Sequence, residues 1–502
     1  MYNNILERPN LNEWIPVLQY RWKLDDNSHS LLYFGLRNYP NQLNNKIKIT
    51  GKLLEIIHAF DGEKSLSVLL EQDKSLDEGD YVTLKNLMDE GVIVEKSKLR
   101  KPATRENHQS CIRCVNNDNV LQGLEFDKNG LCAFCQCVEK AKEERTLKVG
   151  GNNVVTGEEL REKLADNKSR FDVMVLYTGG KDSSYLLWYL AKKLGLRVLA
   201  CTWDMPFNSE TTLRNIKNAQ KKLPNVEFIT RTIAPEDLKK AYRELVFDMG
   251  LPCPCPWISY ALFYPIAVYE KIPVIMDGIE AAQMLMSNAL EAASSTKKKE
   301  DTTPAKEYML NYLRLISSSD ESKSSSFMYN FIKKTNKVFS PVFDQLREII
   351  NHEEQYTLPQ MLRLSSESVY KTWTEVRDII QKELDWEMPA GQTGLLHTSC
   401  QIETYKDYFQ YKSFSDMSMP MFQESVPMFP QSIIELSSAI HFGQITREEA
   451  LKELEERGYE NADQAINKVM KELDIECEDL SYSENMHPIV RKIFTSEGKI
   501  RF

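Results

Sequence analysis

The sequence predicts an α/β protein of several domains, with a parallel β-sheet in its middle part. The chain has 502 residues, more than one hydrophobic core usually organises. Three short, nearly continuous apolar runs have the character of parallel strands covered on both faces: 171–177, 197–203 and 272–276. Helical periodicity occupies segments that separate them: 184–194, 212–222 and 260–270. This alternation predicts strand–helix–strand units with right-handed crossovers.

Composition narrows the class of protein. Hydrophobic residues make up 42% of the chain and charged residues 27%, so we expect most of it to bury a core. The formal net charge of -10 disfavours a nucleic-acid partner, because binding phosphates needs a basic surface. No apolar run reaches the length of about eighteen residues that spans a membrane, and residues 1–10 lack an export signal. We therefore expect a cytoplasmic protein with no membrane partner.

Residues 1–103 are expected to form a small winged-helix-like domain. A strand at 46–50 precedes three helical patterns and a second strand at 92–94. The order of helix, Asp-Gly-Glu, two helices and Glu-Gly-Val-Ile resembles the PqqD-like recognition domains of peptide-modifying enzymes. The resemblance implies recognition of a peptide or carrier, and the alternative is a docking domain without a ligand.

Residues 104–147 form a cysteine-bearing segment. It holds two Cys-x-x-Cys pairs separated by residues 115–131: Cys111, Cys114, Cys132 and Cys135. This spacing is typical of a closed tetrahedral zinc site, the zinc ribbon, and an iron–sulfur cluster is the alternative. Because four thiolates leave no open coordination position, we expect a structural role.

A glycine-rich loop joins the predicted strand at 171–177 to the following helix. Its residues are Thr178, Gly179, Gly180, Lys181, Asp182 and Ser183. The glycines permit positive φ and close backbone approach, so successive N–H groups can converge on phosphate oxygens at a helix N-terminus. Lys181 adds a positive charge and Ser183 a hydroxyl, whereas the glycine spacing of a Walker loop is absent. The sequence predicts a phosphate site, and a purely structural turn is the alternative.

These residues resemble the Ser-Gly-Gly-x-Asp-Ser loop of the ATP pyrophosphatase (PP-loop) superfamily, with Thr178 in place of serine. The resemblance implies a HUP-like catalytic domain over 148–290. It implies that the loop binds the β- and γ-phosphates of ATP while a substrate oxygen attacks the α-phosphate and releases pyrophosphate. Lys181 and Asp182 would take part in catalysis, Asp182 near Mg²⁺, and the next strand would contact adenine through Thr202 and Trp203.

Three further cysteines are candidates for catalysis: Cys253, Cys255 and Cys400. The first two alternate with prolines immediately before a predicted helix, where the pKa of a thiol is lowered. If the three converge, they could hold an iron–sulfur cluster with one open iron, or line a channel. The alternative is that they are ordinary loop residues, and the sequence does not decide whether they converge.

Three features together resemble the N-acetyl sugar amidotransferase family: the paired cysteine motifs, the Cys-Pro-Cys element before 272–280, and a helix start at 442–450. The family adenylates an acetamido oxygen and replaces it with nitrogen from ammonia, which a partner glutaminase delivers. The resemblance places Gly278 and Glu280 at the rim of the active site. Glu280 is equally compatible with a helix-capping carboxylate.

Two additions set the chain apart from that family. They are the N-terminal residues 1–103 and a Ser/Lys-rich insertion, expected to be flexible, over 291–345. Both favour a peptide or carrier-bound substrate over a small molecule. Residues 346–502 are expected to be mostly helical and to complete the active site.

The sequence thus predicts a biosynthetic transferase that adenylates a carbonyl oxygen with ATP and replaces that oxygen with nitrogen. The alternative is a sulfurtransferase of the same superfamily that makes a thioamide or thiolated product with the three candidate cysteines. A third class is a module that binds nucleotide without catalysis. Expected cofactors are ATP, Mg²⁺ and structural Zn²⁺, with an iron–sulfur cluster as the other metal considered. Expected partners are the substrate, an ammonia- or sulfur-supplying protein and, as an assembly, a second copy in a homodimer.

Overall fold

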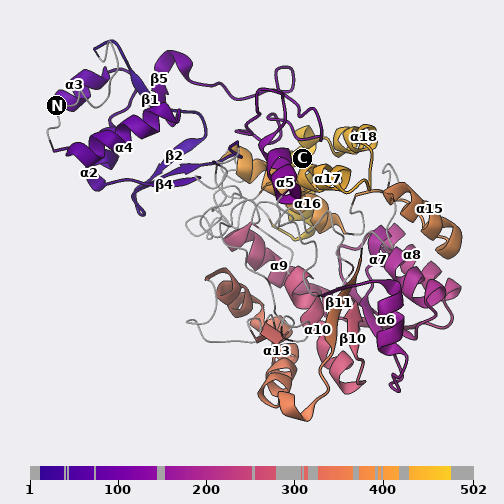
Figure 1. Ribbon diagram of the computed structural model, residues 1–502. Coiled ribbons are helices and arrows are strands. Elements are labelled where there is room, and N and C mark those ends of the chain that lie inside the picture. Colours follow the sequence, from indigo (N-terminus) through magenta and orange to yellow (C-terminus); the bar gives the residue numbers. More distant parts are fainter. Residues whose placement is uncertain are drawn as a thin grey trace. The chain divides into compact units, whose positions relative to one another are not determined.

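The computed structural model describes most of the chain (Figure 1): residues 12–38, 41, 45–72, 75–143, 153–250, 255–276, 278, 307, 310–311, 313–314, 326–365, 372–389, 394–396, 400–417 and 429–475, with only the backbone described at 248–249, 255–257 and 326–337. The chain divides into two compact units. The first unit contains Met1–Glu144, Ala289–Ser294 and Ser413–Pro430, and the second contains Arg145–Asn288, Ser295–Lys412 and Gln431–Phe502.

The first unit begins with a small α/β domain. Its antiparallel sheet has the order β2-β3-β4, and its helices α2, α3 and α4 bury leucines that are fully inaccessible. The element bounds are β2 Trp22–Asp25, β3 Ser30–Tyr33, β4 Lys46–Lys48, α2 Gly51–His58, α3 Leu66–Gln72 and α4 Glu78–Asp89. The strand that follows the helices, β5 (Ile93–Glu95), pairs with β1 (Pro16–Leu18) and not with a sequence neighbour.

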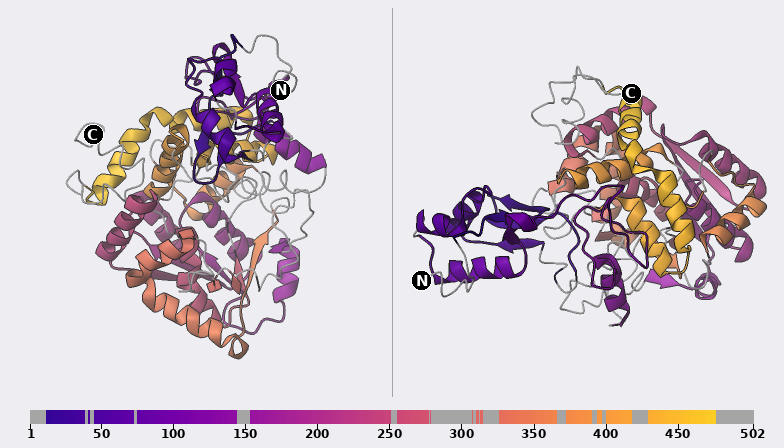
Figure 2. Two further views of the ribbon diagram at one scale, coloured as in Figure 1. Left: turned by 90° about the vertical axis from the view of Figure 1, so that its left-hand side faces the viewer. Right: turned by 90° about the horizontal axis from the view of Figure 1, so that it is seen from above.

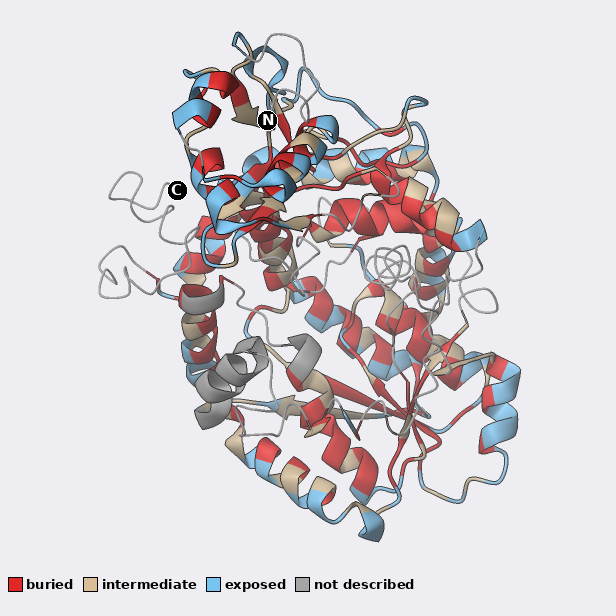
Figure 3. Ribbon diagram, turned by 60° about the vertical axis from the view of Figure 1, so that its left-hand side comes forward, coloured by how far each residue is buried: buried red, intermediate tan, exposed pale blue. Residues whose placement is uncertain are grey.

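The second unit contains a six-stranded sheet with the order β6-β11-β10-β7-β8-β9, and every neighbouring pair is parallel. The strands are β6 Val154–Val155, β7 Val173–Leu176, β8 Val198–Asp204, β9 Glu227–Thr232, β10 Val274–Met276 and β11 Gln360–Leu364. The central strands are buried almost throughout, as Figure 3 shows in red. The predicted α/β class with a parallel sheet is confirmed.

Helices complete the second unit. Those that follow or precede strands are α6 Gly157–Leu164, α7 Lys181–Trp188 with its π-helical continuation η3 Tyr189–Lys193, α8 Glu210–Lys222, α9 Pro235–Met249, α10 Cys255–Tyr269 and α13 Ser326–Asn351. The C-terminal helices are α15 Trp373–Leu384, α16 Gln401–Ser415, α17 Gln431–His441, α18 Arg447–Arg457 and α19 Ala462–Glu472. Helices α17 and α18 lie side by side, drawn in yellow in Figure 2.

The strand order creates a switch point beside β7. From β7 the chain moves outward through β8 to β9, and it then returns to place β10 on the other side of β7. In open parallel sheets the connections diverge at such a point and leave a crevice above the carboxyl ends of the two strands. The glycine-rich loop follows β7 directly, so it lies at this crevice.

One expectation about the region after residue 290 needs correction. Helix α13 covers Ser326–Asn351, so the C-terminal part of the expected flexible insertion is helical. Its apolar side chains recur at helical spacing, with Phe339, Phe343 and Leu346 fully buried. The mostly helical C-terminal region also contributes β11 to the parallel sheet, next to β10. Among the helices of the described ranges, none is long and apolar enough to cross a membrane.

Candidate active site at the carboxyl edge of the sheet

The loop from Thr178 to Ser183 connects β7 to α7. Gly179 has a φ of 74°, which L side chains rarely adopt, and a Cβ there would lie 2.9 Å from the carbonyl oxygen of Thr212. Gly180 is the N-cap of α7, and no side chain caps that helix. The first amides of α7 therefore face the crevice with the helix dipole behind them, an arrangement that attracts anions.

Hydroxyl groups close the loop on itself. The Oγ atoms of Thr178 and Ser183 lie 3.0 Å apart, and the backbone N–H of Thr178 donates to Ser183 Oγ at 3.2 Å. The N–H of Gly180 points to Thr178 Oγ1 at 3.4 Å, a long contact. Thr178 itself is exposed. The threonine that replaces the commoner serine thus keeps the hydroxyl at the outer face of the loop.

Lys181 does not project into solvent. Its side chain is 3% exposed and its ammonium pairs with the carboxylate of Asp182. The Nζ atom also lies 4.7 Å from the ring centroid of Trp373, the first residue of α15. A cation over an indole face is stabilised electrostatically, more so when shielded from water. The positive charge is therefore held inside the protein directly under the loop.

The carbonyl oxygen of Gly179 points into the protein. It accepts a hydrogen bond from Trp386 Nε1 at 3.0 Å and a longer one from Asn215 Nδ2 at 3.5 Å. Both side chains are buried, Trp386 just after α15 and Asn215 in α8. Figure 1 shows α15 next to α7 and α8. Neither residue, nor Trp373, was predicted from the sequence.

The next strand, β8, places Thr202 and Trp203 beside the loop. The hydroxyl of Thr202 donates to the carbonyl oxygen of Tyr177 at 2.9 Å, which fixes the start of the loop. Trp203 is buried and meets Phe339 of α13 edge to face, with ring centroids 5.9 Å apart. Its indole Nε1 has no hydrogen-bond partner among the residues that the structure describes. A buried donor without a partner at this edge is the feature expected where a ligand supplies the acceptor.

Cys400 lies at the same edge of the sheet. It forms an antiparallel bridge with Asn208, which follows β8, and the N–H of Gln401 donates to the carbonyl oxygen of Phe207. The Cys400 side chain is buried. The segment after β8 thus holds the first turn of α16 above the carboxyl end of the sheet.

The chain enters the Cys-Pro-Cys segment close to α16. Gly250, the αL cap of α9, has its carbonyl oxygen 3.4 Å from Tyr405 Oη, and a Cβ on it would overlap the ring of Phe409. The segment ends at Cys255, the first residue of α10, which confirms the predicted position at a helix N-terminus. Cys253 lies outside the described residues, so the convergence of the three cysteines stays a prediction.

Gly278 follows β10 and faces α7, because a Cβ on it would lie 3.5 Å from Leu186 Cδ2. It is therefore on the β10 side of the crevice, opposite the strand that carries Trp203. Glu280 lies outside the described residues.

The four cysteines of the paired motifs meet in the first unit. All are buried, and their Sγ atoms lie within 4.8 Å of one another, with 3.8 Å between Cys111 and Cys135 and 3.7 Å between Cys114 and Cys132. A tetrahedron with metal–sulfur bonds of about 2.3 Å has edges of about 3.8 Å. Burial, the largest cause, and the neighbouring thiols raise the pKa of Cys132 well above its ordinary value. A cation would reverse this by stabilising thiolates, so the donor set fits one metal ion.

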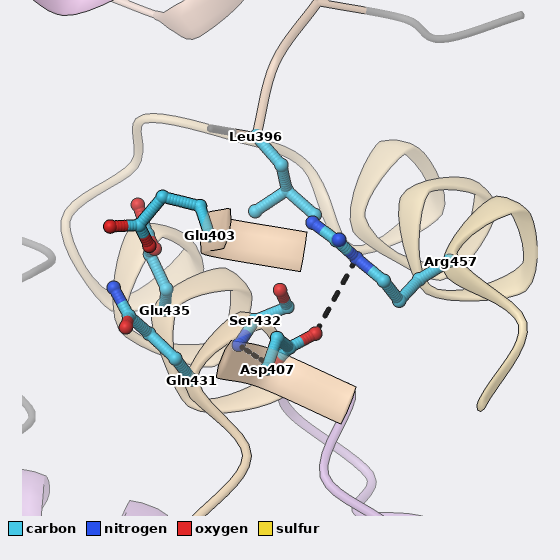
Figure 4. Close-up of a pocket in the computed structure, with 7 residues that line it drawn as sticks. All are labelled: Leu396, Glu403, Asp407, Gln431, Ser432, Glu435 and Arg457. Atoms are coloured by element: carbon cyan, nitrogen blue, oxygen red, sulfur yellow. Dashed lines mark hydrogen bonds and ion pairs between the residues drawn. The ribbon is translucent and has the colours of Figure 1, made fainter. Parts of the chain in front are cut away.

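A separate pocket lies among α16, α17 and α18 (Figure 4). Asp407 pairs with Arg457 at 3.5 Å and accepts the N–H of Ser432, while Glu403 and Glu435 extend to the other side of the pocket. Burial, the largest single cause, would lower the pKa of Arg457, but the charges of Asp407 and of the neighbouring Tyr459, Tyr408 and Glu435 together outweigh it and raise that pKa. None of the predicted site residues that fall within the described ranges lines this pocket.

Comparisons with known proteins do not assign the chain to a family. No protein-family model and no curated protein matches the chain. Among solved structures it is similar to the U34-tRNA thiolase NcsA from Methanococcus maripaludis with its [4Fe-4S] cluster, at 14% sequence identity and a TM-score of 0.21, covering 56% of this chain and 99% of that chain. A TM-score this low does not establish a common fold. The α/β assignment stands on the strand order and register of the sheet itself.

Proposed function

We propose that the chain binds ATP at residues 178–183 and transfers AMP to a carbonyl oxygen of its substrate. The observation that carries this proposal is the loop at the switch point, which turns the Gly179 carbonyl inward and presents backbone amides and the Thr178 hydroxyl to the crevice. Phosphate oxygens are the ligands that such a concave set of donors prefers. The resemblance of the loop to those of PP-loop enzymes supports the same assignment.

In the proposed reaction the substrate oxygen attacks the α-phosphorus of ATP, the bond between α-phosphorus and bridging oxygen breaks, and pyrophosphate leaves. The amides of the loop and of the first turn of α7 hold the β- and γ-phosphates, so they stabilise the charge that develops on the leaving group. The Lys181 ammonium lies over Trp373 and pairs with the Asp182 carboxylate, so its charge would act on the phosphates once Mg²⁺ engages Asp182. Mg²⁺, with Asp182 as the residue that would hold it, would neutralise part of the remaining charge.

Trp203 is proposed to contact the adenine ring. Its orphaned Nε1 and its position at the end of β8 provide one donor toward a base. Thr202 is proposed to act indirectly, since its hydroxyl already holds the Tyr177 carbonyl.

The second step replaces the adenylated oxygen, and AMP leaves. Sulfur is favoured as the incoming atom by one observation: Cys400 is held at the carboxyl edge of the sheet by the segment that follows β8. Replacement by nitrogen requires no thiol and is the competing outcome. The extra N-terminal domain is proposed to recognise a peptide or carrier that bears the amide.

The four-cysteine cluster is proposed to hold a structural zinc ion. Its Sγ spacing matches the edges of a tetrahedron around one ion. Two ligands come from the bend at 111–114, and the other two come from the start of helix α5 (Ala133–Glu143) in the same unit. In an iron–sulfur cube each thiolate binds a different iron, which holds the sulfurs farther apart than in this cluster.

The products of ATP cleavage test the first step. We expect AMP and pyrophosphate, and we expect Lys181→Ala to lower their formation at least tenfold through loss of transition-state charge stabilisation, an effect of about 1.4 kcal/mol or more. Lys193→Ala, at an exposed position of η3, is the matched control. Formation of ADP and phosphate, or full activity in the Lys181 variant, would overturn the proposal.

The transferred atom is tested with Cys400→Ser and the product mass. If sulfur is transferred through Cys400, the variant loses product while AMP formation persists. Cys201→Ser is the control, because Cys201 is buried in β8 and burial raises the pKa of its thiol to about 12, which leaves it inert. A nitrogen-containing product made at an unchanged rate by the Cys400 variant would select the amidotransferase alternative.

A further inference from the structure

The phosphate loop is braced from behind by two residues that are distant in sequence. Trp386 Nε1 and Asn215 Nδ2 both donate to the Gly179 carbonyl oxygen. The separations along the chain are 207 and 36 residues. Both side chains are nearly inaccessible, with 4% and 2% of their surface exposed. The carbonyl oxygen of Gly179 therefore lies in the protein interior and is bonded to two buried donors.

A second set of hydrogen bonds links the two residues that bind the Gly179 carbonyl oxygen, Asn215 and Trp386. Asn215 Nδ2 donates to the Glu387 carbonyl oxygen at 3.0 Å, and its Oδ1 accepts the N–H of Glu387 at 2.7 Å. Outside this pair, Arg214 forms an ion pair with the Glu387 carboxylate at 2.8 Å. The side chain of Asn215 is thus bonded on both sides to the segment that carries Trp386, which fixes its amide orientation.

The consequence for the loop follows from peptide geometry. The C=O of Gly179 and the N–H of Gly180 belong to one planar trans peptide, so they point in opposite directions. Holding the carbonyl inward directs the Gly180 N–H outward, toward the exposed Thr178 hydroxyl. The orientation of this peptide depends on ψ of Gly179 and φ of Gly180, and because both residues are glycines these angles are less restricted than in other residues, so a hydrogen-bond partner is needed to fix the peptide.

We infer that Trp386 is a positioning residue for pyrophosphate binding, with Asn215 as its partner. The indole N–H fixes the Gly179–Gly180 peptide plane and so preorganises the amide that meets the phosphates. This inference rests on the proposed function, because it assumes that the loop binds the terminal phosphates of ATP. Preorganised donors act without reorganisation when charge arrives, which is why their alignment affects affinity.

The experiment compares Trp386→Phe with Trp188→Phe by calorimetric titration with inorganic pyrophosphate and with AMP. Trp386→Phe keeps most of the ring and removes the N–H that bonds Gly179. Trp188→Phe removes a buried indole N–H that has no hydrogen-bond partner in the described part of the chain. We expect the Trp386 variant to bind pyrophosphate about tenfold more weakly and AMP unchanged, since one net hydrogen bond is worth about that factor. The Trp188 variant should match the wild type with both ligands.

The AMP titration separates positioning from general destabilisation, because a merely structural defect weakens both ligands together. Asn215→Leu removes the second donor to the Gly179 carbonyl oxygen. We expect it to weaken pyrophosphate binding and leave AMP binding unchanged, and it replaces Trp386→Phe as the test if that variant does not fold. Equal pyrophosphate affinity in the Trp386 and Trp188 variants would overturn the inference. Failure of the wild type to bind pyrophosphate would instead overturn the proposed function, so the two failures are distinguishable.

Discussion

The four-cysteine cluster and the phosphate loop use backbone amides in opposite ways. In the cluster the N–H groups of Arg113, Asn116 and Cys132 donate to cysteine sulfurs, each at 3.4 Å, so the donors face inward. In the loop the Gly179 carbonyl is turned inward, which leaves the neighbouring amide to face the crevice. The first arrangement uses its amides within the cluster, whereas the second leaves an amide at the crevice, where we propose that phosphates bind. We therefore interpret the buried cluster, whose sulfurs accept the nearby amides, as a structural site. We interpret the loop, whose amide faces the crevice, as a candidate binding site.

Removal of the proposed metal is expected to have the largest effect, a loss of stability of the first unit. Without a cation, four buried thiols lie against one another. Cys135→Ser should lose the bound metal and lower the stability of the first unit by about 4–5 kcal/mol or more. Elemental analysis and urea unfolding measure both quantities. Cys137→Ser is the matched control, since Cys137 is equally buried but lies outside the cluster. Metal retained at full stoichiometry in the Cys135 variant would contradict a four-thiolate site.

A methyl group at Gly179 tests the open loop. Gly179→Ala introduces a Cβ at positive φ and within 2.9 Å of the Thr212 carbonyl oxygen, so the peptide must shift. We expect loss of AMP formation by about a hundredfold, because the displaced amide no longer meets the phosphates.

The control for this substitution is Gly195→Ala. Gly195 also has positive φ, but no described atom lies within 4 Å of a Cβ built there. Alanine at this position therefore has the backbone strain of about 1 kcal/mol without a steric clash like that with Thr212. Comparison of AMP formation in the two variants separates backbone strain from displacement of the loop. Similar activity in both would contradict a binding role for the Gly179–Gly180 peptide.

The smallest expected effect is a loss of stability on substitution of Asp172. This residue lies at the amino edge of the sheet, opposite the loop, where polar side chains hydrogen-bond to one another. Asp172 accepts hydrogen bonds from Arg197 Nε at 3.0 Å and from Arg197 Nη2 at 2.6 Å. Burial, the largest single cause, would raise the pKa of Asp172, but the bonds and charge of Arg197, with Asn167, outweigh it and lower that pKa. A carboxyl group with a lowered folded-state pKa stabilises the fold above its unfolded pKa, and this contribution is lost as pH falls through the folded value.

Asp172→Asn should therefore cost about 1 kcal/mol at neutral pH, a modest value because the arginine is half exposed. The difference from wild type should shrink as pH falls below the ordinary aspartate pKa of about 3.9. Urea unfolding at neutral and acid pH measures it. Asp166→Asn, at an exposed position, should show no such difference, and a cost at neutral pH that persists in acid would contradict an ionic origin.

Prediction from the sequence was most accurate for strands that are continuous apolar runs buried on both faces of the sheet. The strands β7, β8 and β10 are confirmed. Strands β6, β9 and β11 of the same sheet are not predicted by the sequence, and β6 has only two residues. The residues of β9 are only partly buried, and β11 is a short strand from a region whose other segments are helical, so neither carries a strong apolar signal.

By itself the sequence determined the chemical types at each site: glycines and hydroxyls after a buried strand, and two pairs of thiols at metal-binding spacing. These are local facts, because a turn and its neighbouring helix are encoded within a few residues. Only the tertiary structure decided how those groups are aimed. Trp386, Asn215 and Trp373 reach the loop from distant segments, and their contacts depend on how α15 packs against α7 and α8. Such packing is a property of the whole core, which no local pattern records.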